Sequence, residues 1–264
     1  MNTHDGSIEL SFDAYQQRQW HEVSARGLAA RAQKLAPAGK FRREGNAWVP
    51  TPYQGHAVLA VLNSTQDNEA AVRILTDTQE ALVAGFNRVE KLFPLPPVSF
   101  HQTIANTLSD ENYHREVVQK GLADVYPARV ATVLSDIKSG SGEVPVMRMV
   151  GISLFGTALG VLGVFHEKSA FDRVLALRDG FYTHPDIAAL GIRRTRPFIG
   201  HITLGYIESV LDEAERVRLV EVVSDLNRAL AEQNVLFSMP LAELRAYDHL
   251  AEFRPLPHLP NHRF

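Results

Sequence analysis

The chain has 264 residues and a formal net charge of −3; 45% of its residues are hydrophobic and 22% are charged. These values are typical of a folded globular protein with a sizeable core, and they argue against a polybasic protein that coats nucleic acid. A local positive patch could still bind a phosphate ester. The chain contains no cysteine, which excludes disulfides, thiolate catalysis and cysteine-ligated zinc.

The N-terminal fifth of the chain predicts helix followed by a hairpin. Residues 11–35 carry apolar side chains near a helical period, with an interruption expected around a glycine. Residues 39–50 predict a short hairpin around a Glu-Gly-Asn turn, because Gly and Asn tolerate positive φ. We interpret residues 1–50 as an N-terminal helical and hairpin extension, and residues 51–264 as the main domain.

Strands and helices are expected to alternate through the rest of the chain. A mostly apolar run at 56–62 predicts a central strand, and Asp67 is a candidate N-cap for a helix reaching about residue 92. Further strands are expected at 98–107, 146–165 (a hairpin turning near 156), 198–207 and both ends of 235–248, further helices at 113–120, 127–138, 169–182 (capped by Ser169) and 212–232, a flexible connector at 139–142, and an irregular tail.

One nearly uncharged stretch, residues 149–165, is of the shortest length that could span a membrane as a helix. It contains four glycines, so we interpret it as part of a buried β-hairpin. The first six residues lack a basic region followed by an apolar run, which predicts no secretion signal. The sequence therefore predicts a soluble, cytoplasmic protein with no membrane partner, and no obligate protein partner is evident.

The order of strand, capped helix and strand occurs twice. Asp67 precedes His101 by 34 residues, and Ser169 precedes His201 by 32. Both histidines stand in strand-like segments, and each is followed two positions later by a threonine. This repeat of architecture predicts two similar lobes that face each other.

The two His-x-Thr triplets are weak signals alone, and their matching strand settings strengthen them. Side chains alternate between the two faces of a strand, so His101 and Thr103 share one face, as do His201 and Thr203. Each strand thus offers one imidazole and one hydroxyl to the same side. A single triplet would more often be a core histidine beside a threonine, a common strand residue.

These residue types suit the cleavage of a phosphodiester. Histidine has an unperturbed pKa near 6.5, so one imidazole can accept the proton of the nucleophile while a second delivers a proton to the leaving oxygen. The threonine hydroxyls can donate hydrogen bonds to the non-bridging phosphate oxygens. This chemistry requires no metal and no cofactor. The sequence does not decide which histidine acts as the base.

The two motifs resemble the signature of the 2H phosphoesterase superfamily, the LigT-like fold, over roughly residues 50–250. Its signature is His-hydrophobic-Thr/Ser-hydrophobic on two strands. The motif at 201–204 matches fully, whereas the motif at 101–104 departs at Gln102, a polar residue where an apolar one is usual. We expect Gln102 to be hydrogen-bonded at a strand edge.

The resemblance implies an α+β fold with two pseudo-symmetric lobes, each an antiparallel sheet with outer helices, flanking a central cleft. It implies a 2H-type cyclic phosphodiesterase that acts on a cyclic phosphate or phosphodiester of a small phosphorylated substrate, such as a nucleotide or an RNA end. His101 and His201 would be catalytic, and Thr103 and Thr203 would bind the substrate.

Two other readings remain open. The same cleft could hold a nucleotide or phosphorylated ligand without turnover, or the protein could join or trim RNA, which would need a wider basic surface. Several side chains have both a functional and a structural interpretation: Arg193, Arg194 and Arg196 as an anion-attracting rim or a solvated loop, Phe155 and Tyr53 as base-stacking or core residues, and His56 as a supporting or a merely structural histidine.

Overall fold

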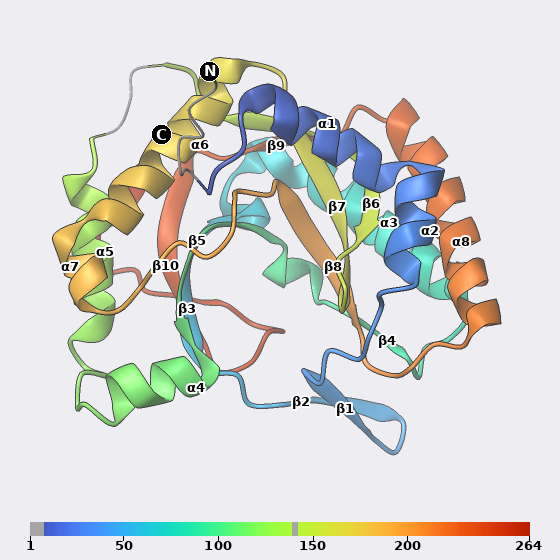
Figure 1. Cartoon of the computed structure of the whole chain (residues 1–264), viewed down its shortest axis with the longest axis horizontal. Helices are drawn as coiled ribbons and strands as arrows, with labels where there is room; N and C mark the ends of the chain where they lie inside the picture. Colours follow the sequence, from blue (N-terminus) through green and yellow to red (C-terminus); the bar gives the residue numbers. More distant parts are fainter. Residues whose placement is uncertain (1–7, 139–141) are drawn as a thin grey trace, which may run out of the picture.

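The computed structural model describes residues 8–138 and 142–264, so the connector expected at 139–142 lies almost entirely outside the described residues. Two antiparallel sheets of five strands each form the centre of the molecule, with helices outside them (Figure 1). The first sheet has the order β11-β10-β3-β5, with β12 also paired to β10, and the second has the order β4-β8-β7-β6-β9. This arrangement confirms the expected α+β class.

The strands of the first sheet are β3 (Gly55–Val61), β5 (His101–Ser109), β10 (Leu241–Tyr247), β11 (Arg254–Pro255) and β12 (His262–Arg263). Those of the second are β4 (Leu92–Pro94), β6 (Val146–Leu154), β7 (Ala158–Phe165), β8 (His201–Ile207) and β9 (Leu236–Ser238). A separate hairpin joins β1 (Phe41–Glu44) to β2 (Ala47–Pro50). The two short strands in the tail were not expected.

The most apolar strands, β3 and β7, lie in the interior of their sheets, with a neighbour on each side. Every residue of β3 and of β7 is buried, which fits strands covered on both faces. The glycine-rich stretch considered as a membrane helix forms the β6–β7 hairpin, as expected. Within residues 8–138 and 142–264, no helix has the length and apolar character needed to cross a membrane.

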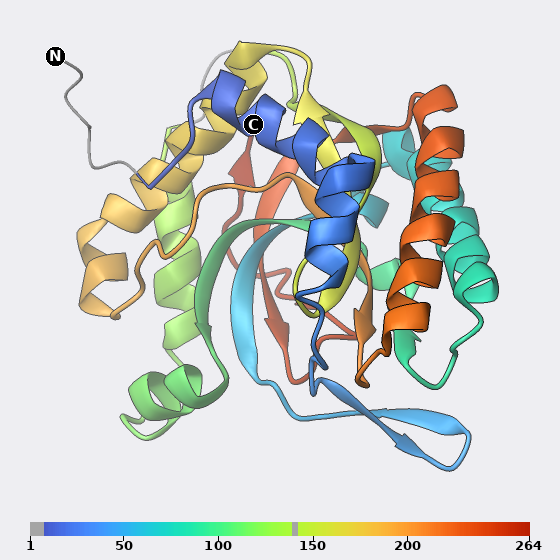
Figure 2. The same ribbon diagram turned by 45° about the vertical axis from the view of Figure 1, so that its right-hand side comes forward.

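The helices form two outer groups, which Figures 1 and 2 show on opposite sides of the sheets. They are α1 (Phe12–Val23), α2 (Ala25–Ala32), α3 (Glu69–Phe86), α4 (Asp110–Tyr113), α5 (Tyr126–Asp136), α6 (Lys168–Thr183), α7 (Pro185–Ala189) and α8 (Glu213–Glu232). Helix α3 follows β3 of the first sheet but packs with β4, β8 and α8, whereas α6 follows β7 of the second sheet and reaches β5. This exchange of helices ties both sheets to one core.

The N-caps expected at Asp67 and Ser169 are wrong, whereas the helix expected at 212–232 starts where predicted. Asp212 is the N-cap of α8 and forms a capping box with Glu215, which satisfies two otherwise unpaired backbone N–H groups. Asp67 lies in a preceding 3₁₀ turn, and Asn68 stands at the N-cap of α3. Ser169 lies inside the first turn of α6, where its side chain caps nothing.

Helix α1 is hydrogen-bonded to β7 and to the residue immediately before β8. The Tyr15 hydroxyl donates to the Gly163 carbonyl at 2.5 Å, and Gln19 Nε2 donates to the carbonyls of Gly163 and Gly200 at 2.8 Å. Tyr15 and Gln19 are fully buried. The N-terminal segment therefore supports the backbone immediately before His201, and the division of the chain at residues 50 and 51 stays a prediction.

Candidate functional site

One cleft of about 270 Å³ contains both His-x-Thr motifs. His101 and Thr103 enter it from β5, and His201 and Thr203 enter it from β8. Strand β5 is the edge strand of the first sheet and contacts β8 of the second. All four residues singled out in the sequence are thus brought together, and all four are half-buried in the cleft wall.

The two imidazoles make the same kind of hydrogen bond, from Nδ1 to the backbone carbonyl two residues earlier. The Nδ1 atom of His101 lies 2.6 Å from the Ser99 carbonyl oxygen, and that of His201 lies 3.0 Å from the Ile199 carbonyl oxygen. A carbonyl oxygen only accepts hydrogen bonds, so Nδ1 must carry the proton in each ring. The neutral tautomer then leaves the Nε2 lone pair available as a base on both rings.

The charge state of both rings follows from their surroundings. Burial lowers the pKa of His101 to about 4, opposed by its bond to the Ser99 carbonyl and reinforced by the positive charges of His201 and Arg245. Burial likewise lowers the pKa of His201 to about 4. Both rings are therefore neutral near pH 7 in the free protein, and an anion between them would favour protonation of one.

Each imidazole contacts an aromatic ring. The Phe253 ring lies edge-on to His101 with ring centroids 4.3 Å apart, and the Phe155 ring lies 5.2 Å from His201. Phe155 and Tyr53, which were expected either to stack on a base or to pack in the core, both line the cleft. The sequence did not predict Phe253 as a site residue, because it lies in the proline-rich tail, outside any periodic pattern.

Gln102 connects the two motifs directly. Its side-chain Nε2 donates to the carbonyls of Thr103 at 2.7 Å and Ile199 at 3.1 Å, and its Oε1 accepts from the backbone N–H of His201 at 2.6 Å. The side chain is fully buried. Gln102 is hydrogen-bonded on an edge strand, as expected, and in addition it bridges to the opposite sheet. Gln102 therefore links the strand that carries His101 to the backbone at the start of the strand that carries His201.

Replacing Gln102 by leucine should lower kcat with little change in KM. The variant removes one hydrogen-bond partner from each of the Thr103 and Ile199 carbonyls and from the His201 N–H, and each buried group left unsatisfied costs about 1–3 kcal/mol of stability. A misplacement of 1 Å between reacting groups costs about 10²-fold in rate. Steady-state kinetics beside the exposed control Gln119→Leu would measure the effect, and equal kcat values in the two variants would contradict a positioning role.

The remaining candidates divide between the cleft and other places. His56 lies outside the cleft between the rings of Tyr113 and Tyr126, and burial lowers its pKa to about 4. Of the three arginines ahead of the second motif, Arg196 lines the cleft. No group of three or more His, Asp or Glu side chains able to hold a metal occurs within residues 8–138 and 142–264.

Comparisons with known proteins show the fold and no family. No protein-family model matches the chain, and no curated protein matches it. A conserved protein of unknown function from Agrobacterium tumefaciens shares 16% identity and has a TM-score of 0.60, over 89% of this chain and 96% of that one. Usb1 from Kluyveromyces marxianus, solved with uridine monophosphate, shares 12% identity with a TM-score of 0.41, over 76% and 98% of the two chains.

Proposed function

We propose that the protein is a metal-independent phosphoesterase that opens a cyclic phosphate or cleaves a phosphodiester of a nucleotide or RNA end. The observation that carries this proposal is the matched pair of imidazoles in one cleft, each with Nδ1 bound to a backbone carbonyl and Nε2 left free. The 2H-like motifs give the same assignment. Thr103 and Thr203 are the proposed donors to the non-bridging phosphate oxygens.

The reaction requires one neutral and one protonated histidine. The neutral imidazole accepts a proton from water at Nε2 while the water oxygen forms a bond to phosphorus. The bond from phosphorus to the ribose oxygen breaks, and the second imidazole donates its Nε2 proton to that oxygen. The two histidines end with their protonation states exchanged, so release of a proton from the first to solvent and uptake of a proton by the second restore the starting state.

A substrate panel tests the proposal. The purified chain is incubated with nucleoside 2′,3′-cyclic phosphates and with short RNAs ending in a cyclic phosphate, with and without EDTA. We expect product to form at similar rates in the presence and in the absence of EDTA. Saturable binding without product would instead favour a ligand-binding protein, and activity restricted to oligomers would favour an RNA-trimming factor. A rate that depends on added zinc or magnesium would overturn the mechanism.

The pH dependence should differ between kcat/KM and kcat. In the free protein both histidines have pKa values lowered to about 4, so the form with one imidazolium becomes populated only as the pH falls. A bound phosphate anion raises the pKa of the imidazole facing it, because it stabilises the charged form. The kcat/KM profile reports the free enzyme and the kcat profile reports the complex.

We therefore expect the optimum of kcat/KM to lie at lower pH than the optimum of kcat. Steady-state kinetics on a cyclic nucleotide between about pH 4 and pH 9 would measure both curves. Folding is followed in parallel by circular dichroism, so that acid unfolding is not mistaken for titration of the site. Coincident optima would contradict coupling between substrate binding and protonation.

A further inference from the structure

Arg196 differs from the cationic side chains next to it in having no acidic partner. Arg178 is 3% exposed and is paired with Glu9 at 2.9 Å, and Arg194 is paired with Asp179 at 2.7 Å. Arg196 is exposed, lines the cleft, and donates from Nη2 to Asn106 Oδ1 at 3.2 Å. Within residues 8–138 and 142–264 no carboxylate pairs with Arg196, so its charge stays available in the cleft.

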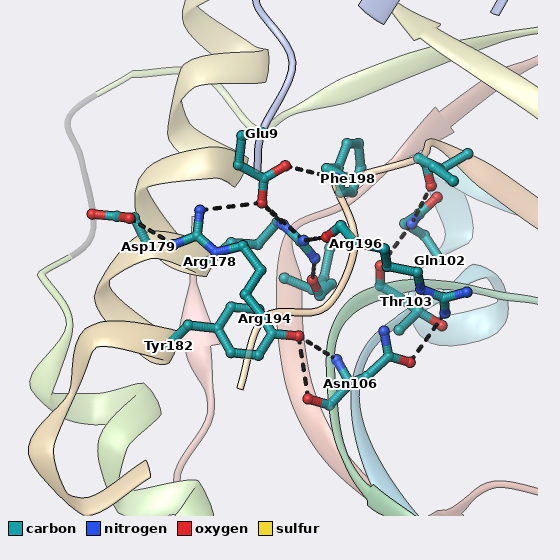
Figure 3. A network of polar contacts seen from close by, with 12 residues as sticks. Glu9, Gln102, Thr103, Asn106, Arg178, Asp179, Tyr182, Arg194, Arg196 and Phe198 are labelled. Atoms are coloured by element: carbon teal, nitrogen blue, oxygen red, sulfur yellow. Dashed lines mark hydrogen bonds and ion pairs between the residues drawn. The ribbon is translucent and has the colours of Figure 1, made fainter. Parts of the chain in front are cut away.

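Buried groups hold the backbone at Arg196 and just after it (Figure 3). Arg178 Nη2 donates to the Arg196 carbonyl at 3.1 Å, and Glu9 Oε2 accepts from the Phe198 N–H at 2.6 Å. Glu9 Oε1 also lies 3.4 Å from Arg194. The segment that leads into the second motif is therefore held by an ion-pair network rather than by a strand ladder, and it presents Arg196 at a defined position.

The backbone of Asn106 is also fixed by hydrogen bonds. The Tyr182 hydroxyl accepts from the Asn106 backbone N–H at 2.8 Å and donates to its carbonyl at 3.2 Å. Asn106 lines the cleft, and its Oδ1 is occupied by Arg196. The side-chain amide therefore has only its NH₂ left to offer, a donor beside a guanidinium. A neighbouring pair of free donors with one positive charge is a site for an anion.

This pair lies away from the two histidines along the same cleft. Asn106 follows Thr103 by three residues of β5, which places it about 10 Å further along the strand. A single phosphate group spans less than this separation, so Asn106 and its partner Arg196 are placed to meet a different phosphate from one held beside Thr103. The Arg196 charge nonetheless acts in the cleft: burial is the main cause of the lowered pKa of His201, and the positive charge of Arg196 lowers that pKa further.

We propose that Arg196 and Asn106 form a second anion subsite, which binds another phosphate of the substrate whose scissile phosphate lies between the histidines. This rests on the proposed function for the place of the scissile phosphate. The cleft then selects nucleotides with a phosphate on both sides of the ribose. That second phosphate can be the terminal 5′-phosphate of a mononucleotide or the linking phosphate of an oligonucleotide, which present the same oxygen chemistry.

Binding calorimetry tests the subsite without requiring turnover. The probes are adenosine 2′-monophosphate and adenosine 2′,5′-bisphosphate, measured on the wild type, on Arg196→Gln and on the neighbouring exposed control Arg193→Gln. Hydrogen bonds to charged groups contribute about 1.5–3 kcal/mol, so we expect the wild type to prefer the bisphosphate by roughly 10-fold to 100-fold. Arg196→Gln should lose that preference and Arg193→Gln should keep it.

Equal affinity of the wild type for both probes would overturn the subsite, as would an equal loss of preference in the two variants. A dinucleotide carrying a 2′-phosphate then identifies the source: tighter binding than the bisphosphate indicates an oligonucleotide, and weaker binding a mononucleotide. Failure of the proposed function is seen separately, because a protein that turns over no cyclic phosphate could still show the bisphosphate preference and lose it in Arg196→Gln.

Discussion

Replacing His101 or His201 by alanine should lower kcat by about 10²–10⁴-fold on any cyclic phosphate that the wild type opens. The two rings have the same backbone bond at Nδ1 and pKa values lowered to about 4, so each is equally suited to exchange a proton through Nε2. The double variant should be little slower than either single variant, because a proton shuttle fails once one member is lost. Initial rates under saturating substrate measure this effect.

His166→Ala is the matched control, since the His166 side chain is 95% exposed and lies outside the cleft. It should retain wild-type kcat. Circular dichroism and thermal unfolding should show that all variants are folded, because His101 and His201 are half-buried and their removal creates no large core cavity. A single variant with undiminished kcat would remove that histidine from the mechanism.

The second large effect concerns stability. Replacing Arg178 by methionine should lower the free energy of unfolding by about 3–5 kcal/mol, because it removes a cation 2.9 Å from the buried carboxylate of Glu9. The two side chains are 3% and 7% exposed, and Arg178 also donates to the carbonyls of Ile104 and Arg196. Arg194 remains 3.4 Å from Glu9, so we expect the lower end of this range. Urea unfolding followed by circular dichroism measures the change.

Lys168→Met, on the same helix, is the control for losing a surface ion pair. Lys168 and Asp172 are 65% and 51% exposed, and removing such a pair costs below about 0.5 kcal/mol. Adding Glu9→Gln to Arg178→Met should restore part of the stability, because the amide removes the buried negative charge and can still accept from Phe198. A loss below about 1 kcal/mol in Arg178→Met would show that the pair does not hold this segment.

The strands that carry the site could be predicted from local pattern. Strands were expected at 98–107 and 198–207, where β5 and β8 lie, and alternation put each histidine and its threonine on one face. The helix starts at Asp67 and Ser169 were wrong because several residues near each start could serve as a cap. Capping preference contributes about 1 kcal/mol, which tertiary packing readily overrides.

The other site residues could not be predicted from the alternation of side chains along a strand. The pairing of β5 with β3 shifts by one residue next to Thr103, where Leu59 pairs with Thr103 but Val58 pairs with Ala105. Such a bulge changes which residues face the cleft, so Asn106 enters it where simple alternation from Thr103 points to Ala105. Phe253 and Arg196 come from irregular segments, whose positions are set by contacts with distant parts of the chain rather than by local period.

The most direct test is a proton and nitrogen NMR titration of the histidine side chains with a nucleoside 2′-monophosphate. If two imidazoles converge on one phosphate, the Nε2 signals of His101 and His201 will shift together with a single dissociation constant, and the pKa of at least one ring will rise above its free value of about 4. Shifts confined to one ring, or different dissociation constants for the two, would contradict a shared phosphate.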